Sequence, residues 1–149
     1  MASIGDRAAL PRAAARAAAE RAAGILAAKP QVTLVYLFGS AVDSDTPNVR
    51  DVDLAVVTDP PFVTDQLMKC RADLIEATRA PIDLISLNEA SIMLAWEVVD
   101  RGVCLFARDP DVETDFVTRA RARYWDFKPY RDVQWRLAGE RLAERRVGP

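Results

Sequence analysis

Three aspartates stand out because each lies in a short run of otherwise apolar residues. Asp51 and Asp53 are two residues apart in DVDLAVV (51–57), and Asp83 is the charged residue of IDLIS (82–86). Side chains at positions i and i+2 of a strand point to the same face of its sheet. Neighbouring carboxylates repel unless a cation joins them, and hard oxygen ligands suit Mg²⁺ or Mn²⁺. The pattern therefore predicts a divalent metal site.

A glycine and a serine precede these acids and directly follow the apolar run VTLVYLF (32–38). If a helical turn begins there, backbone N–H groups and the Ser40 hydroxyl face outward at a positive helix end, which suits a phosphate group. Gly39 would let the phosphate approach the backbone closely. A Gly-Ser pair alone is usually a simple turn, so the prediction depends on the order and spacing of the whole set.

The composition excludes several other chemistries. The chain has 149 residues and no histidine, which excludes Ser-His-Asp triads and histidine-ligated zinc. The net charge is −2, unlike that of a strongly basic nucleic-acid-binding protein, and no apolar run reaches the roughly 18 residues that cross a bilayer. Cys70 and Cys104, without a Cys-x-x-Cys motif, are typical of reduced core thiols in a cytoplasmic protein.

Helices and short strands are expected to alternate within one domain. Runs of β-branched and apolar residues predict strands at 32–38, 51–57, 82–86 and 103–107. Helices are expected at 10–28, at 64–78, from an Asn88 cap to Arg101, at 109–127 and at 130–146, with a bend or break at Lys128-Pro129. The fold class is therefore α/β (α+β), with a small mixed sheet of about four strands flanked by helices.

This order also suggests how the domain is organised. Residues 1–29 would form an Ala/Arg-rich N-terminal helix, 31–107 the catalytic core and 108–149 the C-terminal helices. We expect the first helix to bury an apolar stripe made of Leu10, Ala14, Ala18, Ala22 and Ile25. The core is expected to contain Met68, Met93, Trp96, Cys70 and Cys104.

The order Gly39-Ser40, then Asp51 and Asp53, then Asp83 on the next strand resembles the nucleotidyltransferase superfamily with the DNA polymerase β-like fold. The short length is similar to that of its minimal nucleotidyltransferase (MNT) branch. Within that branch, LVYLFGS (34–40), IDLISLNEAS (82–91) and VCLF (103–106) resemble the MntA-like antitoxins of HEPN–MNT toxin–antitoxin pairs. The resemblance covers about residues 31–107.

The resemblance implies a role for each of these residues. Gly39 and Ser40 would hold the phosphates of ATP, and Asp51 and Asp53 would bind Mg²⁺ or Mn²⁺. Asp83 would join one metal ion and help to deprotonate the acceptor hydroxyl. The implied reaction transfers AMP from ATP to a tyrosine of a partner HEPN toxin, which makes the protein an antitoxin in a hetero-oligomer.

One position departs from the family pattern, and two other functions remain open. Arg50 occupies a site where a small polar residue is common, and it would pair with Asp51 or with a phosphate. The protein could instead be a non-catalytic antitoxin that neutralises its toxin by binding, but such a binder has no need of three converging acids. A small-molecule nucleotidyltransferase of the aminoglycoside type would usually carry an additional acceptor domain.

The C-terminal segment combines aromatic and basic residues. Residues 119–146 contain nine Arg or Lys and four acids, together with Tyr124, Trp125, Phe127, Tyr130 and Trp135. Interfaces favour this mixture, but the aromatic residues would equally suit packing on the sheet. Direct binding of nucleic acid is not expected, because the net charge is low and no motif supports it. Lys69, Arg71 and Arg79 are expected to be solvated surface residues.

Overall fold

A four-stranded mixed sheet forms the centre of the molecule. The computed structural model describes residues 9–43, 45 and 47–147. The strand order is β5 (Ile82–Ser86), β4 (Val52–Thr58), β2 (Val32–Phe38) and β6 (Val103–Ala107). Strand β2 is antiparallel to both β4 and β6, whereas β5 runs parallel to β4. The predicted mixed sheet of about four strands is confirmed.

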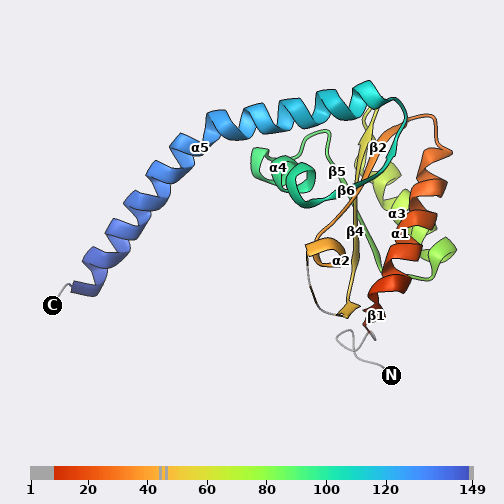
Figure 1. The fold of residues 1–149 in the computed structure, drawn as a ribbon, viewed down its shortest axis with the longest axis horizontal. Helices are drawn as coiled ribbons and strands as arrows, with labels where there is room; N and C mark the ends of the chain where they lie inside the picture. The colour runs from red at the N-terminus through yellow and green to blue at the C-terminus, as the bar shows by residue number, and fades with distance from the viewer. Residues whose placement is uncertain (1–8, 44, 46, 148–149) are drawn as a thin grey trace.

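Helices cover both faces of this sheet (Figure 1). Helices α1 (Arg12–Ala27) and α3 (Thr64–Thr78) share one hydrophobic cluster with the sheet, and α4 (Ile92–Arg101) and the first part of α5 (Pro110–Val147) share a second cluster on the other face. The short helix α2 (Ser40–Asp43) follows β2, and β1 (Leu10–Pro11) pairs with β3 (Asn48–Val49). None of the described helices has the length and apolar character needed to cross a bilayer.

The alternation of side chains along β4 decides which face carries the acids. Val52, Leu54 and Val56 are fully buried in the cluster with α1 and α3. Ala55 belongs to the opposite cluster with α4 and α5. Because side chains alternate along a strand, Asp53 lies on the same face as Ala55, at the end of the sheet where β4 begins.

The predicted apolar stripe of α1 is only partly right. Of its residues, Ala22 is fully buried, and Leu10, Ala18 and Ile25 are partly buried against the same cluster, but Ala14 is exposed. The other fully buried residues of the helix are Ala15, Ala19 and Leu26. Leu10 lies in β1 and not in the helix. Alanine surrounds this helix on every side, so the pattern gives no clear apolar face, and the packing of Leu26 selects the rotation.

Asn88 was predicted to cap α4, but the helix begins four residues later. Ser91 is the cap, and its Oγ accepts a hydrogen bond from the Leu94 N–H at 3.1 Å. The Asn88 side chain instead bonds both backbone groups of Thr58, accepting from its N–H at 3.0 Å and donating to its carbonyl at 2.7 Å. Asn88 therefore joins the chain leaving β5 to the last residue of β4.

Most of the predicted core residues are in place, with one exception. Cys70 is buried and Cys104 partly buried, both as free thiols. Trp96 stacks on Tyr124 of α5, with ring centroids 4.0 Å apart. Met68 was wrongly assigned to the core, because it is 64% exposed on α3. It lies next to Leu67, which packs against the buried Cys70 and Leu74 side of the helix.

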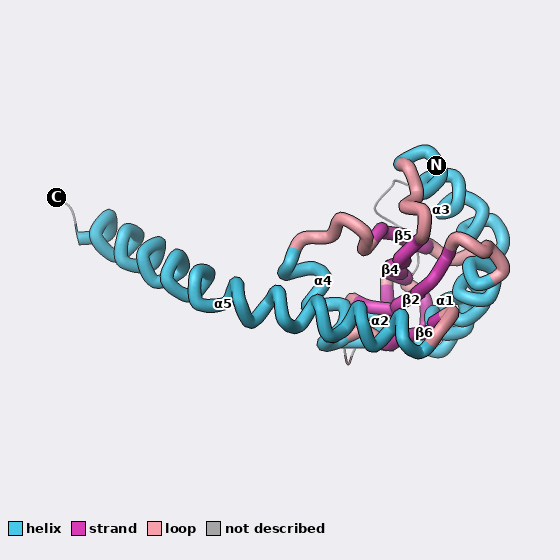
Figure 2. The backbone as a smooth tube through the Cα atoms, turned by 90° about the horizontal axis from the view of Figure 1, so that it is seen from above, coloured by secondary structure: helices cyan, strands magenta, loops and turns pink. Residues whose placement is uncertain are grey.

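The C-terminal region is one helix and not two. Helix α5 has 38 residues and continues through Pro129, so it would be roughly 57 Å long if straight. Figures 1 and 2 show that its second half projects from the body, and Figure 1 shows a change of direction along it. A proline inside a helix removes a backbone hydrogen bond and is a common cause of such bending.

The aromatic residues of α5 have two different environments. Tyr124 is 5% exposed and packs against α4, whereas Trp125, Tyr130 and Trp135 are 60%, 70% and 68% exposed. Packing on the sheet is therefore wrong for these last three.

The first part of α5 is tied to the sheet by the Tyr36 hydroxyl, which donates to Glu113 at 3.5 Å. Burial raises the pKa of Tyr36, so this hydroxyl stays protonated as a donor.

We expect Asn88→Ala to lower the free energy of unfolding by about 1–3 kcal/mol, because it leaves polar groups of the buried Thr58 without their partner. Urea denaturation measures the change. Glu89→Ala, at the exposed neighbouring position, is the control and should have little effect. Equal stability of the two variants would show that the Asn88 bonds contribute nothing.

Candidate functional site

The three predicted acids lie at one end of the sheet. Asp53 of β4 and Asp83 of β5 are direct register partners in the parallel pair. Residues paired in this way have their side chains on the same face, which here is the face of α4. Asp51 immediately precedes β4 and is exposed, whereas Asp53 and Asp83 are partly buried. Two of the acids are thus brought together by strand pairing and the third by its nearness in sequence.

These carboxylates act on one another electrostatically. The pKa of Asp53 is raised, chiefly by burial, then by the charge of Asp83 and then by that of Asp51. Among the described residues, however, no three Asp, Glu, Cys or His side chains come close enough to form a ready-made metal site. The acids therefore form a group under mutual repulsion and not a closed set of ligands.

The Gly39 turn lies directly against the acids. Phe38 is the register partner of Asp53, so the turn that follows β2 reaches the start of β4. Gly39 has φ = +76°, which favours glycine, and a methyl group added to it would overlap Oδ2 of Asp53. The predicted helical turn is present: α2 begins at Ser40, and the Val42 N–H donates to the Gly39 carbonyl at 3.0 Å.

Arg12 holds this turn in place, and sequence reasoning missed it. Its guanidinium donates to the carbonyl oxygens of Ser40 at 3.0 Å, Ala41 at 2.9 Å and Val42 at 3.4 Å. These carbonyls belong to α2, so a cation of α1 fixes the helical turn beside the acids. Arg12 is one of several arginines in an alanine-rich segment, and nothing in its local pattern distinguishes it.

Arg71 is a second residue whose role the sequence did not reveal. It was expected to be solvated, yet its Nε donates to the Ile82 carbonyl at 3.1 Å and lies 3.8 Å from Oδ1 of Asp83. Both charged side chains are about half exposed, at 51% and 50%, so the pair contributes little stability. The pair matters locally, because it places the Arg71 cation beside Asp83. Arg50 is exposed, and no ion pair with Asp51 occurs in the described part of the chain.

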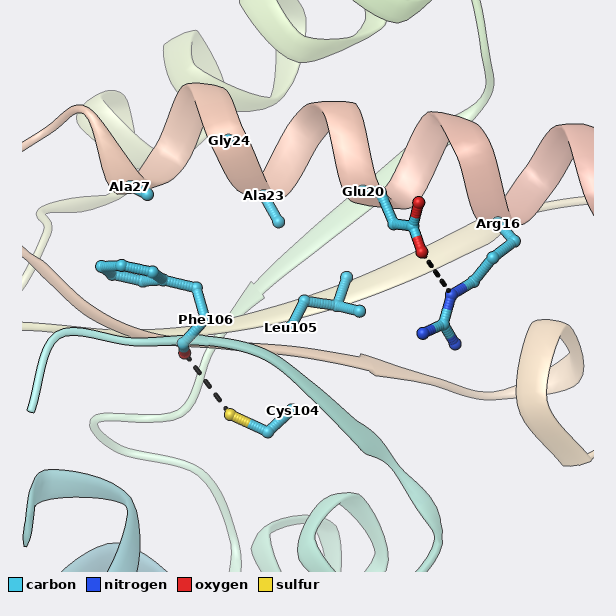
Figure 3. A pocket seen from close by; sticks show the side chains of 8 residues that line it. All are labelled: Arg16, Glu20, Ala23, Gly24, Ala27, Cys104, Leu105 and Phe106. Carbon is cyan, nitrogen blue, oxygen red and sulfur yellow. Dashed lines mark hydrogen bonds and ion pairs between the residues drawn. The ribbon is translucent and has the colours of Figure 1, made fainter. Parts of the chain in front are cut away.

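A separate groove between α1 and β6 has no such chemistry (Figure 3). Its volume is about 400 Å³, and Arg16 and Glu20 form an ion pair of 3.1 Å beside it. Figure 3 shows the Cys104 side chain pointing away from α1. Burial and the nearby Glu113 raise the pKa of this thiol to about 11, so it remains protonated. The end of the sheet with the acids is the better candidate site.

Comparisons with known proteins identify the family and the fold. The family described as "Polymerase beta, Nucleotidyltransferase" matches residues 20–111, which is more than half of the chain. The protein adenylyltransferase MntA of Shewanella oneidensis is 30% identical over 84 residues, which is 56% of this chain. The matched segment spans 60% of the length of that relative.

Solved structures show the same fold. A chain from the complex of a tri-AMPylated Shewanella oneidensis HEPN toxin with its MNT antitoxin has a TM-score of 0.68 and 23% identity, over 83% of this chain and 98% of the other. A chain from a toxin–antitoxin structure with AMP-PNP has a TM-score of 0.70 and 23% identity, over 80% and 97%. The nucleotidyltransferase fold expected from the sequence is confirmed.

We expect Gly39→Ala to lower the free energy of unfolding by roughly 1–3 kcal/mol, because alanine is strained at this φ and its methyl group displaces Asp53. Gly24→Ala is the matched control. Gly24 lies in α1 with open space around it, so alanine there should add about 0.5–1 kcal/mol. Urea denaturation of both variants measures the difference, and a neutral Gly39→Ala would contradict the close approach.

Asp53→Asn should raise the melting temperature in metal-free buffer at pH 7. The pKa of Asp53 is raised in the folded protein, so folding favours its protonated form. Ionisation of Asp53 therefore lowers the stability of the folded protein as the pH rises above the ordinary aspartate pKa of ~3.9. A neutral amide at position 53 avoids this loss.

The gain should shrink as the pH is lowered toward about 3, where both states are protonated. Thermal scans in chelator at several pH values test this dependence. Asp73→Asn, at an exposed position of α3, is the control. A lower melting temperature for Asp53→Asn at pH 7 would mean that its carboxylate is stabilised and not repelled.

Proposed function

This chain belongs to the polymerase beta nucleotidyltransferase family, and we propose on that premise that it transfers AMP from ATP to a tyrosine hydroxyl of a HEPN toxin and so acts as its antitoxin. The observation that carries the proposal is the pairing of Asp53 with Asp83 beside the Gly39 turn. The relative named a protein adenylyltransferase, and the similar chains from structures with a tri-AMPylated HEPN toxin and with AMP-PNP, support the choice of reaction.

The acids suit a divalent cation by their chemistry. Asp51, Asp53 and Asp83 supply only hard carboxylate oxygens, the ligands that Mg²⁺ and Mn²⁺ prefer. Their mutual repulsion, seen in the raised pKa of Asp53, is what a bound cation would relieve. When bound, such an ion would neutralise charge that develops on the attacking and leaving oxygens.

The protein's own groups would then position the two substrates. The Gly39 turn and the Ser40 hydroxyl would receive the phosphates of ATP, with Arg12 keeping α2 in place behind them. Asp83 would accept the proton of the acceptor hydroxyl. The hydroxyl oxygen would form a bond to the α-phosphorus as the bond to the bridging oxygen breaks, and pyrophosphate would leave.

The acceptor would be a protein and not a small molecule. The similar chains come from toxin–antitoxin structures, one of them with a tri-AMPylated HEPN toxin, which supports a protein acceptor. A folded partner would bring its own tyrosine to the acids. We propose that the two proteins form a hetero-oligomer in the cytoplasm, which agrees with the two free thiols.

One observation favours a second function. Among the described residues, the acids do not form a ready-made metal site, as would be acceptable in an antitoxin that neutralises its toxin by binding alone. The two functions make opposite predictions for a variant that retains the surface but loses a carboxylate.

We expect Asp51→Asn and Asp53→Asn each to abolish AMP transfer while the fold is retained. The rate should fall at least 100-fold, where each tenfold change in rate corresponds to about 1.4 kcal/mol of activation free energy. Each change removes a charge from the proposed metal-binding group. Label transfer from α-labelled ATP to a HEPN toxin, the proposed partner, measures the effect, and circular dichroism checks the fold.

The same variants separate enzyme from binder. Under the enzymatic function they should fail to protect cells from the toxin, although they still bind it. A variant with both substitutions that still labels the toxin would overturn the catalytic assignment. Full protection without labelling would instead support neutralisation by binding.

A further inference from the structure

The second half of α5 is an extended helical arm. We define the arm as residues 129–147, about 28 Å long at 1.5 Å per residue. Every described side chain from Asp132 to Arg146 is exposed, including Val133 at 45%, Trp135 at 68% and Leu142 at 61%. Large apolar side chains gathered on such a projecting element indicate an interaction surface.

One face of the arm continues the stripe that packs against α4. The guanidinium of Arg131 lies 5.3 Å from the ring centroid of Tyr124 and 5.0 Å from that of Trp135, so these three residues lie along one side of α5. Steps of three and four residues extend this side to Ala138 and Leu142. The stripe is covered by α4 at Tyr124 but exposed from Trp135 onward.

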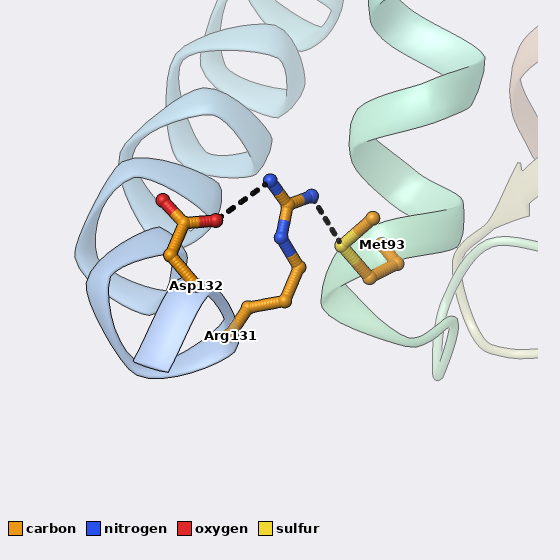
Figure 4. A network of polar contacts seen from close by, with 3 residues as sticks. All are labelled: Met93, Arg131 and Asp132. Carbon is orange, nitrogen blue, oxygen red and sulfur yellow. Dashed lines mark hydrogen bonds and ion pairs between the residues drawn. The ribbon is translucent and has the colours of Figure 1, made fainter. Parts of the chain in front are cut away.

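Arg131 anchors the base of the arm (Figure 4). Its Nη1 donates to Sδ of Met93 on α4 at 3.7 Å, and its Nη2 lies 3.3 Å from the Asp132 carboxylate. The side chain is only 17% exposed. The body therefore holds the arm at its base, while the stripe beyond this point is left for another molecule.

The direction of the arm limits where that molecule can lie. Figure 1 shows the second half of α5 extending beyond α4 and away from the sheet, while it bends down toward the level of α2. The acids and the Gly39 turn are at the α2 end of the sheet, because β4 begins there and α2 follows β2. A protein bound along the stripe would therefore lie on the α4 side of the molecule, the face of the sheet that carries Asp53 and Asp83.

We propose that the stripe of Trp135, Ala138 and Leu142 is the docking surface for the AMP acceptor protein. The occupant would present an apolar helical surface flanked by acidic residues, because the exposed Arg145 and Arg146 follow Leu142 by three and four residues and so flank the end of the stripe. Trp135 would be the central anchor, since tryptophan and arginine are the residues most enriched at interface hot spots. This proposal rests on the proposed function and names the surface by which the partner is held.

A second copy of the chain fits this stripe less well. Two copies joined through the stripe would bury only Trp135, Ala138 and Leu142 of each chain, and the arginines beside Leu142 would gain no acidic partner from the facing stripe. Nucleic acid also fits less well, because Asp132, Glu140 and Glu144 are interspersed with the five arginines of the arm. A protein surface that is apolar at its centre and acidic at its edges complements both the apolar residues and the arginines of the stripe.

The test compares arm variants of the full chain in binding to a HEPN toxin, the proposed acceptor protein. Trp135→Ala should weaken binding about 30-fold, the change expected for loss of a hot-spot residue. Trp135→Phe should retain part of the affinity, and Leu142→Glu should reduce it further. Met68→Ala, which removes an equally exposed apolar side chain from α3, is the matched control and should bind normally.

A second variant ends after Asp132, so that Arg131 keeps its contacts with α4. This variant should lose partner binding. Its affinity for Mg-ATP, measured by calorimetry, should stay within about twofold of wild type, well below the tenfold change that corresponds to 1.4 kcal/mol. If this truncation unfolds the chain, Trp135→Ala decides the matter, because its exposed side chain is not part of the core.

The outcomes distinguish the arm from the reaction. If Trp135→Ala and Leu142→Glu bind the HEPN protein and label it from α-labelled ATP as wild type does, the docking surface is wrong and the proposed function stands. If wild type binds Mg-ATP but neither binds nor labels the HEPN protein, both proposals are overturned. Self-association of wild type that Trp135→Ala abolishes, seen by analytical ultracentrifugation, would assign the stripe to a second copy instead.

Discussion

The parallel pairing of β5 with β4 places Asp83 beside Asp53, and the surrounding structure has to accommodate the repulsion between these two charges. It does so at one open end of the sheet. Asp53 is only partly buried, and its raised pKa reflects both burial and the charges of Asp83 and Asp51. Arg71 reaches from α3 to Asp83, but at 3.8 Å and half exposed it offsets only a small part of the repulsion. An arrangement that leaves charge uncompensated at an accessible position is characteristic of functional sites.

Two side chains from distant parts of the sequence hold the backbone around this sheet. Arg12 of α1 binds three consecutive carbonyls of α2, and Asn88 binds both backbone groups of Thr58 at the end of β4. The first contact fixes the turn next to the acids, and the second fixes the chain as it leaves β5. Only Arg12 supports the candidate site directly, because Thr58 lies at the opposite end of β4 from Asp53, and Arg12 carries no chemistry of its own in the proposed reaction.

One stripe of side chains on α5 packs against the body in the first part of the helix and continues along the arm. Its first part buries Tyr124 against Trp96 and ties Glu113 to Tyr36 in the sheet. The same side of the helix continues beyond α4 as Trp135, Ala138 and Leu142. The helix passes through Pro129 without ending, so the arm continues directly from the part of α5 that packs on the body.

Much of the fold and of the candidate site followed from the sequence alone. The four strands were predicted because runs such as VTLVYLF and IDLIS are rich in β-branched and apolar residues, whose preference is local. The grouping of Asp51 with Asp53 followed from strand periodicity, and the turn after Gly39 from the end of an apolar run. These features depend on residues within a few positions of one another.

Tertiary structure decided the remaining features, because each of them depends on where distant segments of the chain meet. The buried face of α1 was predicted only in part, since alanines on every side gave no preferred face, and packing against the sheet buried Ala15, Ala19 and Leu26. Asn88 has the chemistry of a helix cap, but Thr58 of the neighbouring strand competes for its side chain. Pro129 signals a break, yet the structure continues the helix through it. Arg12 and Arg71 look like any solvated arginines until folding brings a carbonyl or a carboxylate within their reach.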